Sequence, residues 1–316
     1  MRSLALKLWH HSIKCLKCPL LFHQIKILVL DGHFKVPLFK EELRHFISCV
    51  LDEDIGSGDL TTLATIPSIT NLRAELNTRE TIVVAGIDIA ERIIHTVDSA
   101  ISIEILVQDG VEVTTGNTLM RLEGNARKIL TAERSALNVL QHLSGIATLT
   151  RKYVKEIAHT NCRLLDTRKT IPMMRKLAKY ATRMGGAMNH RMCLDDGILI
   201  KDNHIASVGS IKNAIKAAKN YGSLASSIGI TVECDTIEQA AEATAAGADR
   251  LLLDNMSLDM LRLAVSEFSA KVNLEASGGV TLDTIKEIAE TGVDFISVGR
   301  ITQSAPAVDI GLDYLK

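Results

Sequence analysis

Two short stretches of this 316-residue chain concentrate the side chains that could do chemistry. The first, DTRKT at 166–170, directly follows a short apolar run. The second surrounds the apolar run 197–200 and holds His190, Arg191 and Lys201. Apolar segments that stop abruptly in charged residues are typical of the strands of an α/β barrel at their catalytic ends. The density of cations predicts a pocket for one or two ligands that carry several negative charges.

Two carboxylates end consecutive predicted strands farther along the chain. Glu233 closes one strand and Asp254 the next, so the two side chains can converge at one face of a parallel barrel. Paired carboxylates can do acid–base work or hold Mg²⁺, a hard cation that takes oxygen ligands. The nearby cations favour Mg²⁺, because metal and phosphate together would complete the charge balance. The simpler alternative is a pair of salt-bridged carboxylates.

The last two predicted strands end in turns that contain glycine. These turns consist of Ser277, Gly278, Gly279 and of Val298, Gly299, Arg300. Turns before helix N-termini present backbone N–H groups to a phosphate, and the late loops of a barrel are its usual phosphate site. Each tripeptide alone is weak evidence, since glycine also serves ordinary turns. Together, at these positions, they predict a phosphate site.

A repeated strand-and-helix pattern after Asn161 must position these residues. Apolar strands are predicted at 163–166, 197–201, 229–233, 250–254, 272–275 and 295–298, and helices at 211–221, 237–246, 258–268 and 282–291. Strand-then-helix repeats imply parallel strands with right-handed crossovers, in a barrel or an open doubly wound sheet. Six strands fall short of eight, so an incomplete α/β barrel is expected over residues 146–316.

Residues 36–145 are predicted to form a separate α+β domain. Short apolar runs alternate with glycine turns between 69 and 123, which is typical of a mostly antiparallel sheet. A strongly helical stretch, 126–159, follows, and Ser144-Gly145 predicts a break between two helices within it. Arg134 lies on this stretch, where an arginine is usually a solvated surface charge.

The acidic turn LDEDIGSGDLTT at 51–62 and the leader at 1–35 are the remaining features. In the turn, Asp59 or Thr61 is expected to cap the next helix, which is the simpler interpretation than a metal site. Before Asp31, the leader holds five lysine and arginine residues and no acidic residue. Its apolar residues are too dispersed for a signal peptide, so we favour an extension of unknown role over a targeting segment.

Composition argues against nucleic acid and membranes as partners. Aromatic residues are 3% of the chain and the net charge is −1, so neither a stacking platform nor a global field favours nucleic acid. No apolar run approaches the roughly 20 residues of a membrane span. Six cysteines lack a disulfide framework spacing, which predicts reduced thiols in the cytoplasm. The lone Cys15-x-x-Cys18 has no second ligand pair for zinc.

From about Val36 to the C-terminus, the chain resembles the quinolinate phosphoribosyltransferase family. The motifs that carry the resemblance are, in order, EDIGSGDLTT, AERSALNVLQHLSGIAT, LLDTRKTIP, NHRMCLDDGILIKDNH, VECDT, LLLDN, EASGGV and ISVGRIT. The resemblance implies that quinolinate and phosphoribosyl diphosphate give nicotinate mononucleotide, diphosphate and CO2, with Mg²⁺, in NAD synthesis. It also implies an N-terminal α+β open-sandwich domain, on which residues near the C-terminus could pack, followed by an incomplete, TIM-like α/β barrel.

The resemblance assigns roles residue by residue. Arg168, His190, Arg191 and Lys201 are expected to cradle quinolinate, with Thr167 in the same ligand-lining segment. Lys169 would reach the diphosphate, while Glu233 and Asp254 would engage the ribose hydroxyls and Mg²⁺. The turns 277–279 and 298–300 would hold the 5-phosphate. In a homodimer or larger assembly, Arg134 would enter the neighbouring subunit's site. Met173-Met174 and Ala187 replace residues that are often small in the family.

Two other functions remain open. A paralogue of the same fold, of the molybdenum-operon type, would act on a different acceptor. A non-catalytic phosphate or nucleotide sensor would keep the glycine turns but could lose Arg134, Arg168 or Lys201. The cation set is complete, which argues against both alternatives.

Overall fold

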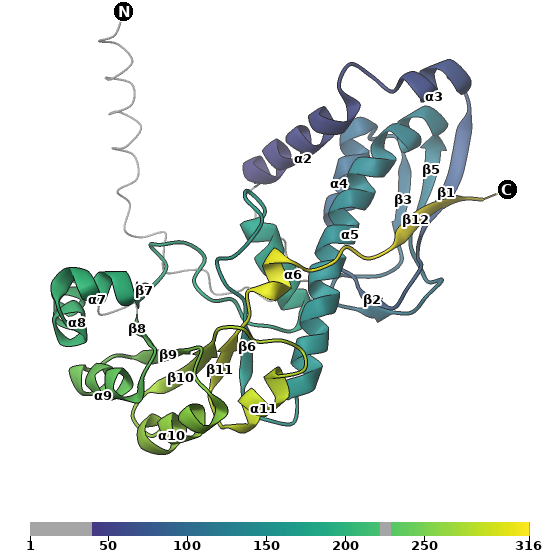
Figure 1. The fold of residues 1–316 in the computed structure, drawn as a ribbon. Coiled ribbons are helices and arrows are strands. Elements are labelled where there is room, and N and C mark those ends of the chain that lie inside the picture. The colour runs from purple at the N-terminus through teal and green to yellow at the C-terminus, as the bar shows by residue number, and fades with distance from the viewer. Residues whose placement is uncertain (1–39, 222–228, 316) are drawn as a thin grey trace, which may run out of the picture. The chain divides into compact units, whose positions relative to one another are not determined.

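The computed structural model describes residues 40–221 and 229–315 (Figure 1). The leader 1–35, with Cys15 and Cys18, lies outside the described residues, as do residues 36–39. The helix α2 runs over Lys40–Ile55 in the described part. A short helix, α3 (Leu60–Thr65), follows, and the Asp59 carboxylate caps it by accepting a hydrogen bond of 2.9 Å from the Thr62 backbone N–H. The expected cap at Asp59 is confirmed.

The N-terminal domain contains an antiparallel sheet with the strand order β12-β1-β5-β3. Its strands are β1 (Asn71–Thr78), β3 (Ser102–Ile105), β5 (Thr118–Asn125) and β12 (Ile310–Tyr314). A separate pair joins β2 (Ile82–Val83) to β4 (Glu112–Val113). The helix α4 (Ile87–Val97) contributes Ile89, Ala90 and Ile93 to the buried core of this domain. The final strand thus returns from the barrel to pair with β1.

The expected break at Ser144-Gly145 is wrong, because α5 (Ala126–Ile157) is one continuous helix of 32 residues. Both residues make tertiary contacts from within this helix. The Ser144 hydroxyl accepts a hydrogen bond of 3.0 Å from the Ala85 backbone N–H. A Cβ atom at Gly145 would lie 2.1 Å from the Pro306 carbonyl oxygen, so this glycine admits the crossing C-terminal segment. A close backbone approach, not a helix end, explains the glycine.

The second domain is a six-stranded parallel sheet with the order β6-β11-β10-β9-β8-β7. Its strands are β6 (Arg163–Leu165), β7 (Ile198–Ile200), β8 (Ile230–Cys234), β9 (Arg250–Asp254), β10 (Asn273–Ser277) and β11 (Phe295–Ser297). The expected strands and the parallel arrangement are confirmed. The sheet is open between β6 and β7, and an isolated parallel bridge from Leu165 to Met188 extends its β6 edge. This arrangement is the incomplete α/β barrel that the sequence predicted.

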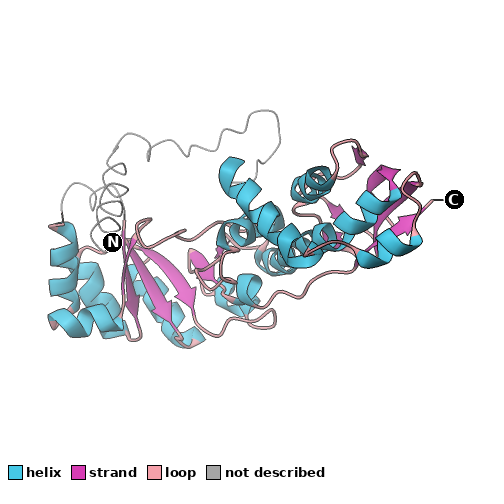
Figure 2. Ribbon diagram, turned by 90° about the horizontal axis from the view of Figure 1, so that it is seen from above, coloured by secondary structure: helices cyan, strands magenta, loops and turns pink. Residues whose placement is uncertain are grey.

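Helices pack beside this sheet, as Figure 2 shows from above. They are α7 (Asp202–Val208), α8 (Ile211–Lys219), α9 (Ile237–Ala246), α10 (Leu258–Phe268), α11 (Ile285–Glu290) and α12 (Arg300–Gln303), whereas the buried hydrophobic residues of α6 (Arg175–Gly185) belong to the N-terminal core. The sequence predicted α8 to α11 but gave no helix at α7. Buried aliphatic residues fill the space between strands and helices, among them Val232, Leu251 and Leu274.

The helix α5 connects the two domains. Its residues Ile146 and Ala147 belong to the N-terminal core, whereas Tyr153 and Ile157 belong to the core of the barrel. The division expected between 145 and 146 therefore falls inside a single rigid element. No helix in the described part of the chain is both long enough and apolar enough to span a membrane.

Candidate active site at the strand exits of the barrel

The residues that could do chemistry lie where the parallel strands end. Because parallel strands share a direction, their carboxyl ends meet at one edge of the sheet. Following the strand order, this edge presents the segment 167–169, the turns 298–300 and 277–279, and then Asp254, Glu233 and Lys201. The expected convergence of these residues at one edge is thus what the topology provides.

Residues at the ends of neighbouring strands are in close contact. A Cβ atom at Gly299 would lie 2.9 Å from Cδ of Lys169, and the Thr302 hydroxyl donates to the Lys169 carbonyl at 2.7 Å. Gly278 has a left-handed φ of 92°, and a Cβ atom there would lie 2.2 Å from the Asn255 side-chain oxygen. Glycine is required at Gly278 both by its backbone conformation and by its neighbour.

The guanidinium groups of Arg168 and Arg191 lie at this edge, close enough for the charge of one to act on the other. Burial lowers the pKa of Arg191, and the positive charge of Arg168 lowers it further. The Arg191 Nη1 atom donates to the Gly197 carbonyl at 3.1 Å. Among the described residues, the buried Nε of Arg168 has no hydrogen-bond partner. Like charges held together with donors to spare form a site that an anion would complete.

Lys201 and Glu233 form an ion pair at the exits of β7 and β8. The Glu233 side chain is 14% exposed and that of Lys201 is 44% exposed, so the pair lies at the rim of the site. The Lys201 backbone N–H donates to His204 Nδ1 at 3.0 Å, where the chain enters α7. His204 is therefore a helix-capping residue.

His190 is turned toward the barrel interior. Its Nδ1 accepts a hydrogen bond of 2.7 Å from the Arg191 backbone N–H, which leaves the ring proton on Nε2. That Nε2 lies 3.5 Å from Oε1 of Glu275, a fully buried carboxylate that also pairs with Arg250 at 3.1 Å. Burial raises the pKa of Glu275, but His190, Ser297 and Arg250 lower it more, so the net shift is downward.

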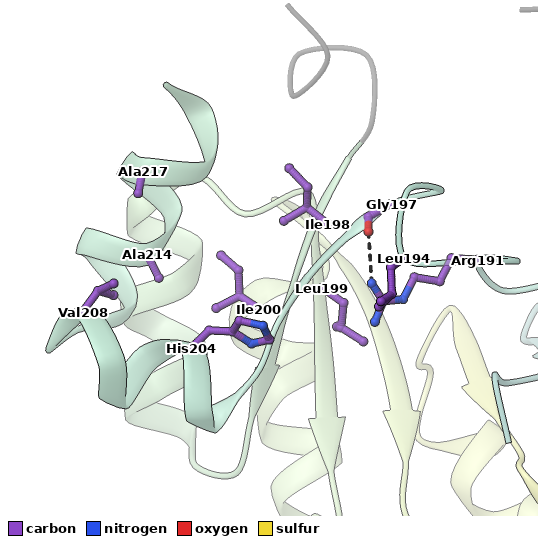
Figure 3. A pocket seen from close by; sticks show the side chains of 10 residues that line it. All are labelled: Arg191, Leu194, Gly197, Ile198, Leu199, Ile200, His204, Val208, Ala214 and Ala217. Carbon is purple, nitrogen blue, oxygen red and sulfur yellow. Dashed lines mark hydrogen bonds between the residues drawn. The ribbon is translucent and has the colours of Figure 1, made fainter. Parts of the chain in front are cut away.

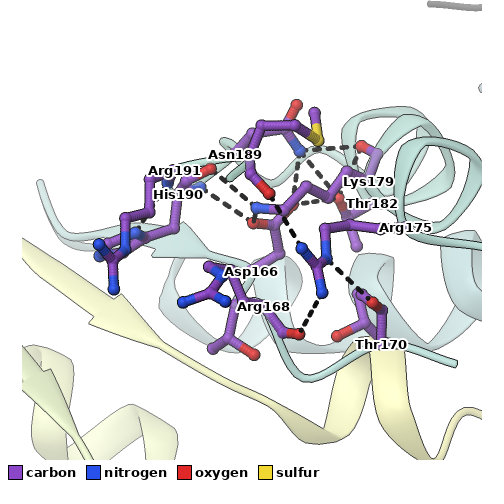
Figure 4. Close-up of polar contacts among 12 residues, drawn as sticks. Asp166, Arg168, Thr170, Arg175, Lys179, Thr182, Asn189, His190 and Arg191 are labelled. Carbon is purple, nitrogen blue, oxygen red and sulfur yellow. Dashed lines mark hydrogen bonds and ion pairs between the residues drawn. The ribbon is translucent and has the colours of Figure 1, made fainter. Parts of the chain in front are cut away.

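A second buried carboxylate, Asp166, lies directly after β6 (Figure 4). It forms an ion pair with Lys179 of α6, and both side chains are 0% exposed. Sequence reasoning treated Asp166 as one of several charges after a strand and did not single out Lys179. The available signal was a lysine on α6 among residues that the helix buries, such as Ala178 and Tyr180.

A pocket of about 350 Å³ lies beside β7, against α7 and α8 (Figure 3). Its lining is mostly apolar and includes Ile198, Ile200, Val208 and Ala214, with Arg191 at one side. This lining offers few polar groups to a charged ligand, so we place the candidate site at the strand exits and not in this pocket.

Comparisons with known proteins agree with this architecture. The family model for the C-terminal domain of quinolinate phosphoribosyl transferase matches residues 146–313, and that for the N-terminal domain matches residues 59–144. The chain belongs to the quinolinate phosphoribosyltransferase family. The family that the motifs indicated is thereby confirmed.

Relatives of the quinolinate phosphoribosyltransferase family cover nearly the whole described chain. The nicotinate-nucleotide pyrophosphorylase [carboxylating] of Mycobacterium leprae is 40% identical over 276 residues, which are 85% of this chain and 96% of the relative. A probable enzyme of the same name from Bacillus subtilis is 40% identical over 274 residues, 87% of this chain and 92% of the relative. The solved nicotinate-nucleotide pyrophosphorylase from Francisella tularensis is 41% identical, with a TM-score of 0.85, and covers 89% of this chain and 98% of that one.

Met173 and Arg134 lie apart from the strand ends. Met173 has a left-handed φ of 66° and is 92% exposed, so the backbone bears a cost that glycine would avoid. Arg134 is exposed on the half of α5 whose buried residues, such as Ala132 and Ala136, pack the N-terminal core. It is not one of the residues at the strand exits, and its contribution to a neighbouring subunit's site stays a prediction.

Proposed function

We propose that this chain is a carboxylating nicotinate-nucleotide pyrophosphorylase, which joins quinolinate to phosphoribosyl diphosphate and releases diphosphate and CO2. The observation that carries the proposal is the set of charges at the strand ends, where Arg168 acts on Arg191 and Lys201 pairs with Glu233, in a member of this family. The relatives' names supply the reaction, and the charges at the strand exits fit both substrates.

The neighbouring charges of Arg168 and Arg191 suit a pyridine with adjacent carboxylates. Arginine presents planar, forked donors that match a carboxylate, and Arg168 and Arg191 together balance two negative charges. Lys201 adds a third cation, which is held by Glu233 when no ligand is bound. Nicotinate, with one carboxylate, would leave one of the guanidiniums unpaired, so the arrangement favours the diacid as acceptor.

The strand ends between Arg168 and Lys201 along the same edge suit a sugar carrying phosphates. The turns 277–279 and 298–300 would hold the 5-phosphate through backbone N–H groups, and Lys169 would reach the diphosphate. Glu233 and Asp254 fit a bound Mg²⁺, because this ion is commonly held by one or two carboxylates together with substrate phosphates and waters. No group of three or more potential metal ligands lies together in the described part of the chain, which suits a metal brought with the substrate. Bound Mg²⁺ would supply charge stabilisation for the departing diphosphate.

The chemistry then needs positioning more than acid–base catalysis. The lone pair of the quinolinate ring nitrogen forms a bond to C1 of the ribose, and the bond from C1 to diphosphate breaks with its electron pair on oxygen. The positive ring next accepts the electrons of the C2–carboxylate bond as CO2 leaves, and that carbon takes a proton from water. Lys169 stabilises the leaving charge, while Arg168 and Arg191 orient the ring.

We also propose a homodimer or larger assembly in which Arg134 serves the neighbouring site, and a cytoplasmic location. The exposure of Arg134 on α5 leaves it available to another subunit. The free thiols of Cys49, Cys162, Cys193 and Cys234 suit a reducing compartment.

The test is a product assay. Purified protein is incubated with quinolinate, phosphoribosyl diphosphate and Mg²⁺, and nicotinate mononucleotide and CO2 are quantified. We expect both products in equal amounts, with little product from nicotinate under the same conditions. Turnover of nicotinate without CO2 would identify a different acceptor, and no turnover of either would contradict the proposed enzyme.

A further inference from the structure

The Asp166 carboxylate is saturated by donors from two other segments of the chain. Its Oδ1 pairs with Lys179 and accepts the His190 backbone N–H at 2.9 Å. Its Oδ2 accepts the Thr182 hydroxyl at 2.9 Å and the Asn189 side-chain amide at 2.5 Å. An ionised carboxylate has about four lone-pair positions, so this one is fully used inside the protein. It has no capacity left for a substrate.

Asp166 and Lys179 hold His190 by both of its backbone polar groups. Asp166 accepts its N–H, and the Lys179 ammonium donates to its carbonyl at 2.8 Å. The Asn189 amide adds a hydrogen bond of 2.8 Å to the Lys179 carbonyl. The segment that leads into Arg191 is therefore fixed at consecutive peptide groups. Figure 4 shows Arg191 leaving this segment on the side of Arg168.

Asp166 also restrains the backbone segment that carries Arg168, because it lies two residues before Arg168 at the end of β6. The same buried pair thus joins the segment carrying Arg168 to the segment carrying Arg191. These two cations repel each other, and each would gain hydration by moving apart into water. A rigid link between their backbones is the means by which the fold can keep them adjacent before a dianion arrives.

The helix α6, which carries Lys179, also forms hydrogen bonds with the N-terminal domain and with α5. The Tyr180 hydroxyl donates to Asp109 at 2.6 Å, and Asp109 also accepts the backbone N–H of Ile87 at 3.0 Å. Arg151 of α5 donates to the Gly185 carbonyl at 2.9 Å, at the end of α6. The helix α6 is therefore a fixed support between the N-terminal core and the site.

We propose that Asp166, with Lys179, is a positioning residue for the acceptor subsite: the pair holds Asn189 to Arg191 against the exit of β6 and so preorganises the Arg168–Arg191 grip. The inference rests on the proposed function for the identity of the dianion. A buried ion pair is a poor source of stability, since apolar residues of similar volume often serve as well. Its use for geometry explains why charges occupy this place, and it predicts an effect on one substrate only.

The test uses Thr182, whose hydroxyl is one donor to Asp166 and touches no substrate. Thr182→Val removes this donor at constant shape, Thr182→Ser restores it, and Thr150→Val is the matched control. Thr150 is equally buried, but its hydroxyl donates only to the Ile146 carbonyl within α5, at 2.7 Å, among the contacts in the described chain. Dissociation constants for quinolinate and for phosphoribosyl diphosphate with Mg²⁺ are measured by calorimetry, and folding by urea unfolding.

We expect Thr182→Val to raise the quinolinate dissociation constant about fivefold, less than the loss of a direct hydrogen bond to the ligand would, because the lost bond acts only through the position of the arginines; the phosphoribosyl diphosphate constant should stay within about twofold. Thr182→Ser should return to the parent value and Thr150→Val should not depart from it. Asp166→Asn should show a larger, equally selective loss. The Thr182 series decides the question even if Asp166→Asn does not fold.

Equal weakening of both ligands, or unchanged quinolinate binding in folded Thr182→Val, would overturn the positioning role. Product formation by the parent protein is followed in parallel. A parent that turns over quinolinate while Thr182→Val binds it normally refutes this inference and leaves the proposed function intact. A parent that neither binds nor turns over quinolinate refutes the proposed function, and the inference with it.

Discussion

Replacement of Arg191 by alanine should separate ligand affinity from protein stability. Among the described residues, this guanidinium donates one hydrogen bond, to the Gly197 carbonyl at 3.1 Å, and the like charge of Arg168 acts on it. Of its five N–H donors, several therefore remain for a carboxylate. Hydrogen bonds to charged groups contribute about 1.5–3 kcal/mol each. Loss of a forked pair, less the relief of the repulsion with Arg168, gives about 3 kcal/mol, or roughly a 100-fold rise in the quinolinate dissociation constant.

The same change should leave the stability of the protein nearly unchanged. The lost hydrogen bond to Gly197 costs about 1 kcal/mol, while removal of a partly buried cation beside another one returns a similar amount. The urea midpoint should therefore stay close to that of the parent. Phosphoribosyl diphosphate, which we place on the turns 277–279 and 298–300 and at Glu233 and Asp254, should bind within about threefold of its parent affinity.

Two further variants sharpen the assay, which is calorimetric titration of each ligand. Arg191→Lys keeps the charge but not the fork, so we expect about a tenfold loss of quinolinate affinity, between the parent and alanine. Arg262→Ala removes an arginine of α10 that pairs with Asp259 at 2.8 Å, and it should change neither affinity. Equal loss of both ligands in Arg191→Ala, or no loss of quinolinate, would refute the assigned role.

Three other changes test particular features of the fold. Glu275→Gln should cost about 3 kcal/mol of stability at pH 7. The folded pKa of Glu275 is lowered, so the stability that its charge contributes is present above the unfolded pKa of about 4.3 and is lost as pH falls through the folded value. The difference in stability from the parent, measured by urea unfolding, should therefore shrink at lower pH. A constant difference would contradict this. Burial and a nearby carboxylate raise the pKa of the Cys162 thiol to about 12, so iodoacetamide at pH 8 should modify it roughly 100-fold more slowly than the exposed Cys193, as peptide mapping would show; equal rates would argue against its burial. Gly145→Ala should destabilise the protein by about 2 kcal/mol, since its Cβ would meet the Pro306 carbonyl; the gain of about 1 kcal/mol expected for alanine in an open helix would disprove that approach.

The sequence predicted the barrel well because the relevant signals are local. Each parallel strand is a short apolar run between turns, and the strands 250–254 and 295–298 were found within a residue of their observed bounds. The convergence of Glu233 and Asp254 at one edge followed from topology alone. Short strands with few buried residues, such as β4, give no comparable signal.

Tertiary contacts explain what the sequence could not give. Gly145 looks like a helix break, and only the crossing backbone of Pro306 shows why it stands within α5. Lys179 looks like any helical lysine, because its partner Asp166 is 13 residues away and on another element. Glu275 was visible only as the end of a strand, since its partners His190 and Arg250 come from other segments of the chain.

The most direct measurement of the central claim is a crystal structure of the protein with quinolinate. Our account predicts that its two carboxylates lie within about 3 Å of the guanidiniums of Arg168 and Arg191, with Lys201 close by and the ring nitrogen directed toward Glu233 and Asp254. Quinolinate bound in the apolar pocket beside β7, or with its carboxylates turned away from both arginines, would contradict the account.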